Sequence, residues 1–368
     1  MPLTISKRRK NFAETMPLTI FTESLIMQCN TGVKGCVPMT VREQTEAIER
    51  SFLCREACAS SEGRGRSAPE EKCPVRTEFQ RDRDRILHSS AFRRLKHKTQ
   101  VFLAPVGDHY RTRMTHTLEV TQIARTVARA LRMNEDLTEA IALGHDLGHT
   151  PFGHCGESKL NEICKGGFRH YLQSVRVVEF IEKNGKGLNL TYEVKNGIAC
   201  HTNAVAATKE GYIVRLADKI AYLNHDIDDS IRAGVITEKM LPKEATEVLG
   251  HSKSERITSM IMSLIDNGAE DIKMSPEVTQ AEDILYKFMF ENVYHNPIAK
   301  SEEVKAKILI EELFIYYLKH IDDLPPEYKN LIERFGKERA VCDYVSGMTD
   351  IYAINKYSDL FIPKSWRV

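Results

Sequence analysis

The sequence predicts an all-α protein, a helical bundle extended by additional helices at its C-terminal end. From position 79 onward, apolar residues recur with helical spacing, and the alternation typical of strands is scarce. Helix boundaries are marked as well: Asn134 is a favourable N-cap, and Gly148 and Pro151 stop the segment that follows it. A composition of 42% hydrophobic and 28% charged residues over 368 positions fits one large or two ordinary globular domains.

The helices are expected in the following order. Residues 41–59 favour a helix, which ends in the Ser/Gly/Arg/Pro stretch 60–69, predicted to be an exposed loop. Further helices are expected over residues 81–98, 114–131, from Asn134 to Gly148, 211–232, 244–267, 280–292, 302–322 and 326–336. Strands are expected only near the N-terminus and around residues 98–103, and they are short.

Three regions follow from this order. Residues 1–73 form an N-terminal arm, a helix and an exposed loop; 74–234 form the core; and 235–368 form a C-terminal helical region packed on the core. The N-terminal arm contains the run MPLTI twice, at 1–5 and 16–20. Five residues are too few for a structural repeat, so no function is assigned to them.

Composition excludes several classes of protein. A net charge of +1 gives the whole molecule no attraction to nucleic acid or to a membrane surface. No run of 18 apolar residues and no signal peptide is present. Nine cysteines without paired CxxC spacing favour reduced thiols. We therefore expect a soluble, cytoplasmic protein that does not bind membranes.

Histidines are concentrated in one part of the chain, with eight of the 13 between positions 109 and 225. His145 and Asp146 are adjacent, directly before Gly148, where a helix unwinds and the two side chains can converge. Imidazole and carboxylate together are typical ligands of a divalent metal. His116 lies on an otherwise apolar helix face, and Asp218 lies between apolar neighbours, where an unpaired charge is costly. A divalent metal that joins three helices explains all these positions.

The order His116, His145-Asp146 and Asp218 resembles the metal-binding signature of the HD-domain phosphohydrolase superfamily. Longer motifs are similar to one subfamily, the deoxyguanosine-triphosphate triphosphohydrolase-like proteins, over residues 74–234. The motifs are RDRDRILH at 81–88, AFRRLKHKTQVF at 91–102, GDHYRTR at 107–113, HDLGHTPFGH at 145–154, LADKIAY at 216–222 and NHDIDD at 224–229.

The resemblance implies an HD-domain helical bundle that hydrolyses a deoxynucleoside triphosphate (dGTP or several dNTPs) to deoxynucleoside and inorganic triphosphate. It implies that His116, His145, Asp146 and Asp218 hold a divalent metal (Mn, Mg, Fe, Co, Ni or Zn). His154 and Glu157 match a catalytic pair, in which Glu157 orients the imidazole and His154 moves a proton as acid or base. His149, in the same loop, is a further catalytic or phosphate-contacting candidate.

Triphosphate binding requires fixed cations. Arg113, one helical turn before His116, resembles a phosphate-binding arginine of the family, and Lys219 and Arg93 or Arg94 are further candidates. Tyr222 and Asp226 follow Asp218 at helical spacing, where a deoxyribose could be recognised.

One stretch departs from the family pattern. Where relatives usually read His-Asn-Glu-Gln-Ser, this chain reads His170-Tyr171-Leu172-Gln173-Ser174. The matching histidine, His170, is kept as a phosphate contact, but the change at the next two positions can alter base preference or activity.

Two other functions fit the same residues. One is an HD phosphohydrolase of other specificity, such as a nucleotidase, a phosphodiesterase or a single-strand nuclease. The other is a non-catalytic module that senses nucleotides. The resemblance also implies a homo-oligomer, and a nucleotide or single-stranded DNA is a possible effector.

Overall fold

The computed structural model describes residues 39–100, 111–294 and 297–364. The chain divides into two units, residues 1–40 and 41–368. The first lies almost wholly outside the described residues, as do the duplicated MPLTI run and the strands expected near the N-terminus.

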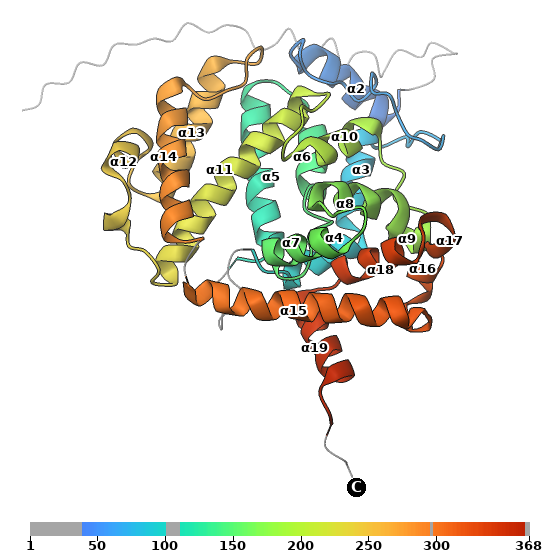
Figure 1. Ribbon diagram of the computed structural model, residues 1–368. Coiled ribbons are helices and arrows are strands. Elements are labelled where there is room, and N and C mark those ends of the chain that lie inside the picture. The colour runs from blue at the N-terminus through green and yellow to red at the C-terminus, as the bar shows by residue number, and fades with distance from the viewer. Residues whose placement is uncertain (1–38, 101–110, 295–296, 365–368) are drawn as a thin grey trace, which may run out of the picture. The chain divides into compact units, whose positions relative to one another are not determined.

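The second unit is helical throughout (Figure 1). Its α-helices are α2 (Val41–Phe52), α3 (Glu78–Leu87), α4 (Ser90–Arg94), α5 (Arg113–Ala130), α6 (Glu135–Gly144), α7 (Gly153–Ile163), α8 (His170–Arg176), α9 (Glu182–Gly185), α10 (Tyr192–Cys200), α11 (Lys209–Arg232), α12 (Lys243–Leu249), α13 (Lys253–Asn267), α14 (Pro276–Asn292), α15 (Pro297–Lys319), α16 (Pro326–Lys329), α17 (Ile332–Phe335), α18 (Lys337–Ser346) and α19 (Asp350–Phe361). Among the described residues, strand pairing is limited to the isolated bridges Arg66–Thr191 and Thr99–Thr112. The predicted all-α class is confirmed.

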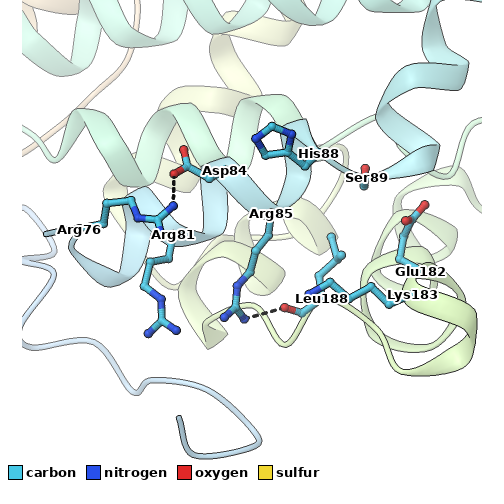
Figure 2. A pocket seen from close by; sticks show the side chains of 9 residues that line it. All are labelled: Arg76, Arg81, Asp84, Arg85, His88, Ser89, Glu182, Lys183 and Leu188. Atoms are coloured by element: carbon cyan, nitrogen blue, oxygen red, sulfur yellow. Dashed lines mark hydrogen bonds and ion pairs between the residues drawn. The ribbon is translucent and has the colours of Figure 1, made fainter. Parts of the chain in front are cut away.

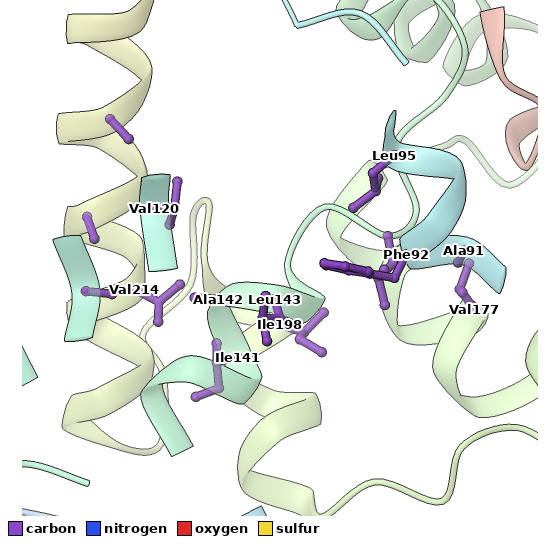
Figure 3. Packing of buried hydrophobic residues seen from close by; sticks show 14 of the residues in the cluster. Ala91, Phe92, Leu95, Val120, Ile141, Ala142, Leu143, Val177, Ile198 and Val214 are labelled. Atoms are coloured by element: carbon purple, nitrogen blue, oxygen red, sulfur yellow. The ribbon is translucent and has the colours of Figure 1, made fainter. Parts of the chain in front are cut away.

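The centre of the unit is built from α5, α6, α10 and α11. Helix α5 packs against both α6 and α11, α10 contacts α6 and α11, and α3 covers α6. Val120, Ile141, Ile198 and Val214 are fully buried in this core, and Figure 3 shows them on their helices. Apolar burial of this kind is the main favourable contribution to folding, so these helices form a rigid base for the polar groups they carry.

The C-terminal helices pack on this core in two groups. Helices α12, α13 and α14 contact one another, and α13 and α14 contact α11. Helix α15 lies across α7, α18 and α19, and α18 also contacts α7 (Figure 1). The segment after the core is therefore in contact with α7.

Three predicted helices are broken in the structure: those over residues 81–98, 244–267 and 326–336, the last divided into α16 and α17. The helix expected over residues 41–59 ends at Phe52. The helix expected over residues 81–98 ends at Leu87, and Ser89 caps α4 by accepting a hydrogen bond from Phe92 N. The helix expected over residues 244–267 is interrupted at Gly250, whose φ of 103° favours glycine. The helix starting after Asn134 is confirmed, since the Asn134 side chain accepts from Leu137 N at 3.1 Å.

The loop over residues 60–69 is exposed over most of its length, as predicted, but two of its residues are held on the core. Ser60 is buried, and the Arg66 guanidinium is only 4% exposed because it pairs with Glu78 at 2.6 Å and with Asp82. Ion pairs with α3 thus hold Arg66 of this loop against the core. No helix of the described residues is both long and apolar enough to cross a membrane.

Candidate metal centre and the adjoining histidine cluster

Three core helices bring the predicted metal ligands His116, His145 and Asp218 into one group, and Asp146 lies beside His145. His116 lies on α5, His145 caps the C-terminal end of α6 with Asp146 directly after it, and Asp218 lies on α11. Asp218 Oδ1 is 3.1 Å from His116 Nε2 and 3.8 Å from His145 Nε2. Asp146 Oδ1 is 3.6 Å from His145 Nε2. The contact of α5 with α6 and α11 therefore gathers side chains that are a hundred positions apart.

The tautomer of His145 tests whether these residues fit a metal. Its Nδ1 donates to Ala142 O at 2.6 Å, so Nε2 carries the lone pair. Nε2 is buried, has no hydrogen-bond partner, and faces the carboxylates of Asp146 and Asp218. A lone pair that faces two carboxylates is unfavourable unless a cation lies between them. The donor set fits a divalent metal.

His116 is oriented in a similar way by a second histidine. His116 Nδ1 is 3.3 Å from His225 Nδ1, and His225 Nε2 is 3.0 Å from Glu119 Oε2. In the tautomer in which His116 donates from Nδ1 to His225 Nδ1, its Nε2 lone pair faces Asp218. Groups that hold a ligand imidazole in this manner raise its basicity. His225 and Glu119 were not singled out in the sequence, although His225 belongs to the dense histidine region.

The two carboxylates stay ionised. Burial alone would raise the pKa of Asp146, but His145 and Arg113 hold that pKa well below its usual value. Burial also opposes ionisation of Asp218, but the neighbouring imidazoles of His116 and His145 lower its pKa. Both groups are therefore anionic at neutral pH, as ligands of a metal must be.

Arg113 is placed beside the metal ligands. Its Nη1 is 2.9 Å from Asp146 Oδ2, its Nε donates to Thr99 O at 3.2 Å, and its Nη2 donates to Gln100 O at 3.4 Å. The side chain is buried. Arg113 thus fixes the Asp146 carboxylate from the side away from His145, in addition to any contact with phosphate.

A second cluster lies next to the metal ligands and contains His149, His154, Glu157 and His170. Glu157 Oε2 is 2.9 Å from His170 Nδ1 and 3.9 Å from His154 Nδ1. The His149 ring stacks on His170 with centroids 4.5 Å apart, and His149 Nε2 is 4.0 Å from Asp146 Oδ1. His154 is 62% exposed, so its imidazole is accessible to a substrate.

His201 completes the second cluster and was missed in the sequence. Its Nδ1 donates to Ile198 O, which leaves Nε2 as an acceptor 3.2 Å from His170 Nε2. Burial lowers the pKa of His201 to about 4. Burial also opposes protonation of His170, but the bond to Glu157 outweighs it and raises the pKa of His170. His170 therefore lies between Glu157 and the neutral His201 as the preferred site for a proton.

Tyr222 and Asp226 lie together on α11, as their spacing predicts. The ring centroid of Tyr222 is 6.2 Å from that of His154, and also 6.2 Å from that of Tyr294, which lies just after α14. Tyr294 donates to Asp226 Oδ2. Burial raises the pKa of Asp226 to about 7. The structure thus places a tyrosine face beside the catalytic candidate His154.

Two residues predicted to contact phosphate, Lys219 and Arg93, have protein partners in the structure. Lys219 Nζ pairs with Glu282 on α14 at 2.7 Å, and Arg93 donates to His88 O and Ser90 Oγ on the protein surface. The unusual residues after His170 are also placed: the Tyr171 ring contacts His170 edge-on, and Leu172 is exposed.

A cavity of about 300 Å³ lies outside the site, between α3 and α9 (Figure 2). Its arginines are already engaged: Arg76 pairs with Asp84 at 2.8 Å, and Arg85 donates to Leu188 O at 2.8 Å. None of the predicted site residues lines this cavity.

The fold and the site define an HD-domain phosphohydrolase. The HD domain family matches residues 113–223, a range that contains all four metal-ligand candidates. The phosphohydrolase-associated domain family matches residues 272–359.

Proteins with similar sequences identify the family within this class. Proteins called deoxyguanosinetriphosphate triphosphohydrolase-like match this chain from Caldanaerobacter subterraneus subsp. tengcongensis (57% identity, 89% of this chain, 98% of the relative), Desulfatibacillum aliphaticivorans (50%, 88%, 99%) and Clostridium tetani (48%, 89%, 97%). The chain belongs to this deoxyguanosinetriphosphate triphosphohydrolase-like family.

Proposed function

We propose that the protein hydrolyses deoxynucleoside triphosphates (dGTP or several dNTPs) to deoxynucleoside and inorganic triphosphate. The observation that carries the proposal is the convergence of two imidazoles, the buried Asp146 carboxylate and the partly exposed Asp218 carboxylate beside a Glu157-His170-His154 cluster. The names of the relatives point to the same substrate class.

In this proposal His116, His145, Asp146 and Asp218 hold one divalent ion, for which Mn, Mg, Fe, Co, Ni and Zn are the candidates. A metal bound there supplies Lewis acidity toward an α-phosphate oxygen. Arg113 keeps Asp146 in place and adds positive charge for the triphosphate.

Side chains of the second cluster donate and accept protons in this reaction. A water oxygen forms a bond to the α-phosphorus while the bond from phosphorus to the 5′-oxygen breaks. The attacking water gives up its protons to solvent, from which His154 is protonated again. His154, exposed toward solvent, gives the departing 5′-oxygen its proton, and the Glu157 carboxylate orients the His154 imidazole. His149 and His170 contact the phosphates, and Tyr222 and Asp226 recognise the deoxyribose.

Assembly, location and regulation remain proposals from the family resemblance. We propose a cytoplasmic homo-oligomer, with a nucleotide or single-stranded DNA as effector. The boundaries at residues 73/74 and 234/235 are likewise proposed.

The test is incubation with each of the four dNTPs across Mn, Mg, Co, Ni and Zn, followed by anion-exchange separation of the products. Inorganic triphosphate is expected from the wild type, and none from Asp146→Ala, which removes a carboxylate facing both His145 and Arg113. Orthophosphate, pyrophosphate or a cleaved oligonucleotide would instead indicate an HD phosphohydrolase of other specificity. Tight nucleotide binding without any product would indicate a sensing module.

A further inference from the structure

The loop that carries His149 is held by a carboxylate from the C-terminal region. Asp350, the first residue of α19, is buried. Its Oδ1 accepts a hydrogen bond from Phe152 N at 2.9 Å, and its Oδ2 accepts one from Thr99 N at 2.9 Å. The two backbone amides lie 198 and 251 positions before Asp350 in the chain, so a single side chain joins three distant segments.

Lys98 makes a second connection between the same segments. It is fully buried, and its ammonium donates to His149 O and, at 3.0 Å, to Ser346 O at the end of α18. His149 and Phe152 belong to the range matched by the HD domain, whereas Ser346 and Asp350 belong to the range matched by the phosphohydrolase-associated domain. Both contacts therefore cross from one matched region to the other.

Asp350 holds a strained residue at the start of α7. Phe152 has φ 62° and ψ 25°, a left-handed conformation that is unfavourable for a residue with a large side chain. Such a conformation persists only where the surroundings impose it. Phe152 is the N-cap of α7, which carries His154 and Glu157 in its first two turns. The bond to Asp350 is thus placed to fix the direction of the catalytic helix.

The other oxygen of Asp350 is connected to Arg113 through Thr99. Thr99 donates its N–H to Asp350 and accepts the Arg113 Nε–H through its carbonyl. Arg113 in turn binds Asp146. One carboxylate is therefore connected by backbone amides both to the helix of His154 and to the arginine that holds a metal-ligand candidate.

We propose that Asp350 is a positioning residue, through which the phosphohydrolase-associated region sets the geometry of the 149–154 segment and of Arg113. Its kinetic consequence rests on the proposed triphosphohydrolase activity. The C-terminal region then contributes directly to the geometry of the site.

The decisive variant is Asp350→Asn, which keeps the size of the side chain but replaces one acceptor oxygen with an amide group that cannot accept. The matched control is Glu182→Gln. Glu182 is also a buried carboxylate whose two oxygens accept from two backbone amides, Ser90 N at 3.1 Å and Ala91 N at 2.7 Å, but these lie outside the site. Comparable losses of thermal stability are expected for both variants.

Three quantities separate positioning from stability. Asp350→Asn is expected to lower kcat about 10- to 100-fold, because small displacements of catalytic groups have effects of this size. KM and bound metal are expected to change less than kcat. Hydrogen exchange measured by mass spectrometry is expected to be faster across residues 147–153 than in the wild type. Glu182→Gln is expected to leave kcat and this exchange unchanged.

A kcat of Asp350→Asn within two-fold of the wild type, or equal to that of Glu182→Gln, overturns the proposal. If Asp350→Asn does not fold, Asp350→Glu, which retains both acceptors on a longer chain, is measured against the same criteria. Should the wild type produce no triphosphate, the proposed function fails separately. Hydrogen exchange then decides about Asp350: equal exchange of residues 147–153 in Asp350→Asn and Glu182→Gln overturns positioning, and faster exchange in Asp350→Asn supports it.

Discussion

His154 is the most accessible group of the second cluster, and it contacts none of the four metal-ligand candidates in the structure. His154→Ala is expected to lower kcat by about 10²-fold, the usual contribution of a proton-transfer group, while the bound metal is retained. Metal content and single-turnover rates measure the two effects separately. His251→Ala, at an exposed histidine between α12 and α13, is the control and should change neither quantity. Loss of metal from His154→Ala would place that imidazole among the ligands.

The structure changes the effect expected from removal of Arg113. From the sequence, removal of Arg113 should weaken substrate binding and leave the metal bound. Because its guanidinium holds Asp146 at 2.9 Å, we now expect Arg113→Ala to weaken metal affinity as well, by about 10- to 100-fold. Titration of the purified apoprotein with Mn²⁺ measures this affinity. Arg176→Ala breaks a comparable ion pair, with Asp343 at 2.6 Å, and should leave metal affinity unchanged. Equal affinities in both variants would contradict the role of Arg113.

The four metal-ligand candidates could be picked out in the sequence, whereas the histidines that contact other histidines could not. His116 and Asp218 contradict the polarity of their neighbours, and His145 and Asp146 are adjacent at a predicted helix end. His201 and His225 act on another histidine, 31 and 109 positions away, and no local pattern reveals such a pairing. Lys219 pairs with Glu282, 63 positions away, and no local pattern reveals this partner either.

At the scale of elements, Gly148 sets the distance between the loop after α6 and helix α8. A Cβ at this position would lie 2.2 Å from Ser174 N and 2.7 Å from His170 O. Gly148→Ala is expected to displace α8, which carries His170, with a loss of about 1–3 kcal/mol in stability and a loss of turnover. Gly166→Ala is the control, because a Cβ there meets nothing within 4 Å. Thermal unfolding and kcat of the two variants provide the comparison, and equal behaviour would contradict the close approach.

The N-terminal end of α11 contributes a pH-dependent term to stability. Burial raises the pKa of Glu210 to about 7, although Cys58 N and Asn134 N donate to it. Between pH 4.5 and 7 the folded state keeps a proton that the unfolded state releases, so stability falls as the pH rises. Glu210→Gln is expected to gain up to about 3 kcal/mol over the wild type at pH 8. At about pH 4, below the unfolded pKa, the gain should nearly vanish, as urea unfolding at the two pH values can show. A gain that is independent of pH would contradict the shift.

Helix positions were predictable, but some helix ends depend on distant residues. The expected helix over 81–98 is divided where Glu182 binds the amides of Ser90 and Ala91, and Glu182 lies more than 90 positions further along the chain. Local propensity contains no information about such a partner. In contrast, Asn134 caps α6 with its own side chain, and this boundary was predicted correctly.

For the whole molecule, the sequence indicated a core and a C-terminal region but not their connection. Lys98 and Asp350 join the two through backbone groups, and a backbone carbonyl or amide has no sequence signature. Contacts of this kind become visible only when the chain is folded.

The candidate metal site connects α5, the end of α6 and α11, so a bound ion would stabilise the whole fold. The carboxylates of Asp146 and Asp218 lie 3.6 and 3.8 Å from His145 Nε2, and a cation would offset the cost of holding both charges there. A metal that binds only the folded state adds about 2.7 kcal/mol when its free concentration is 100 times its Kd. Chelation is therefore expected to lower the Tm, and Mn²⁺ to restore it. His154→Ala should keep the full metal-dependent shift in Tm, and Asp146→Ala should lose it. A shift that persists in Asp146→Ala would mean that the ion binds elsewhere, and the three helices would then lack the common ligand on which the proposed chemistry depends.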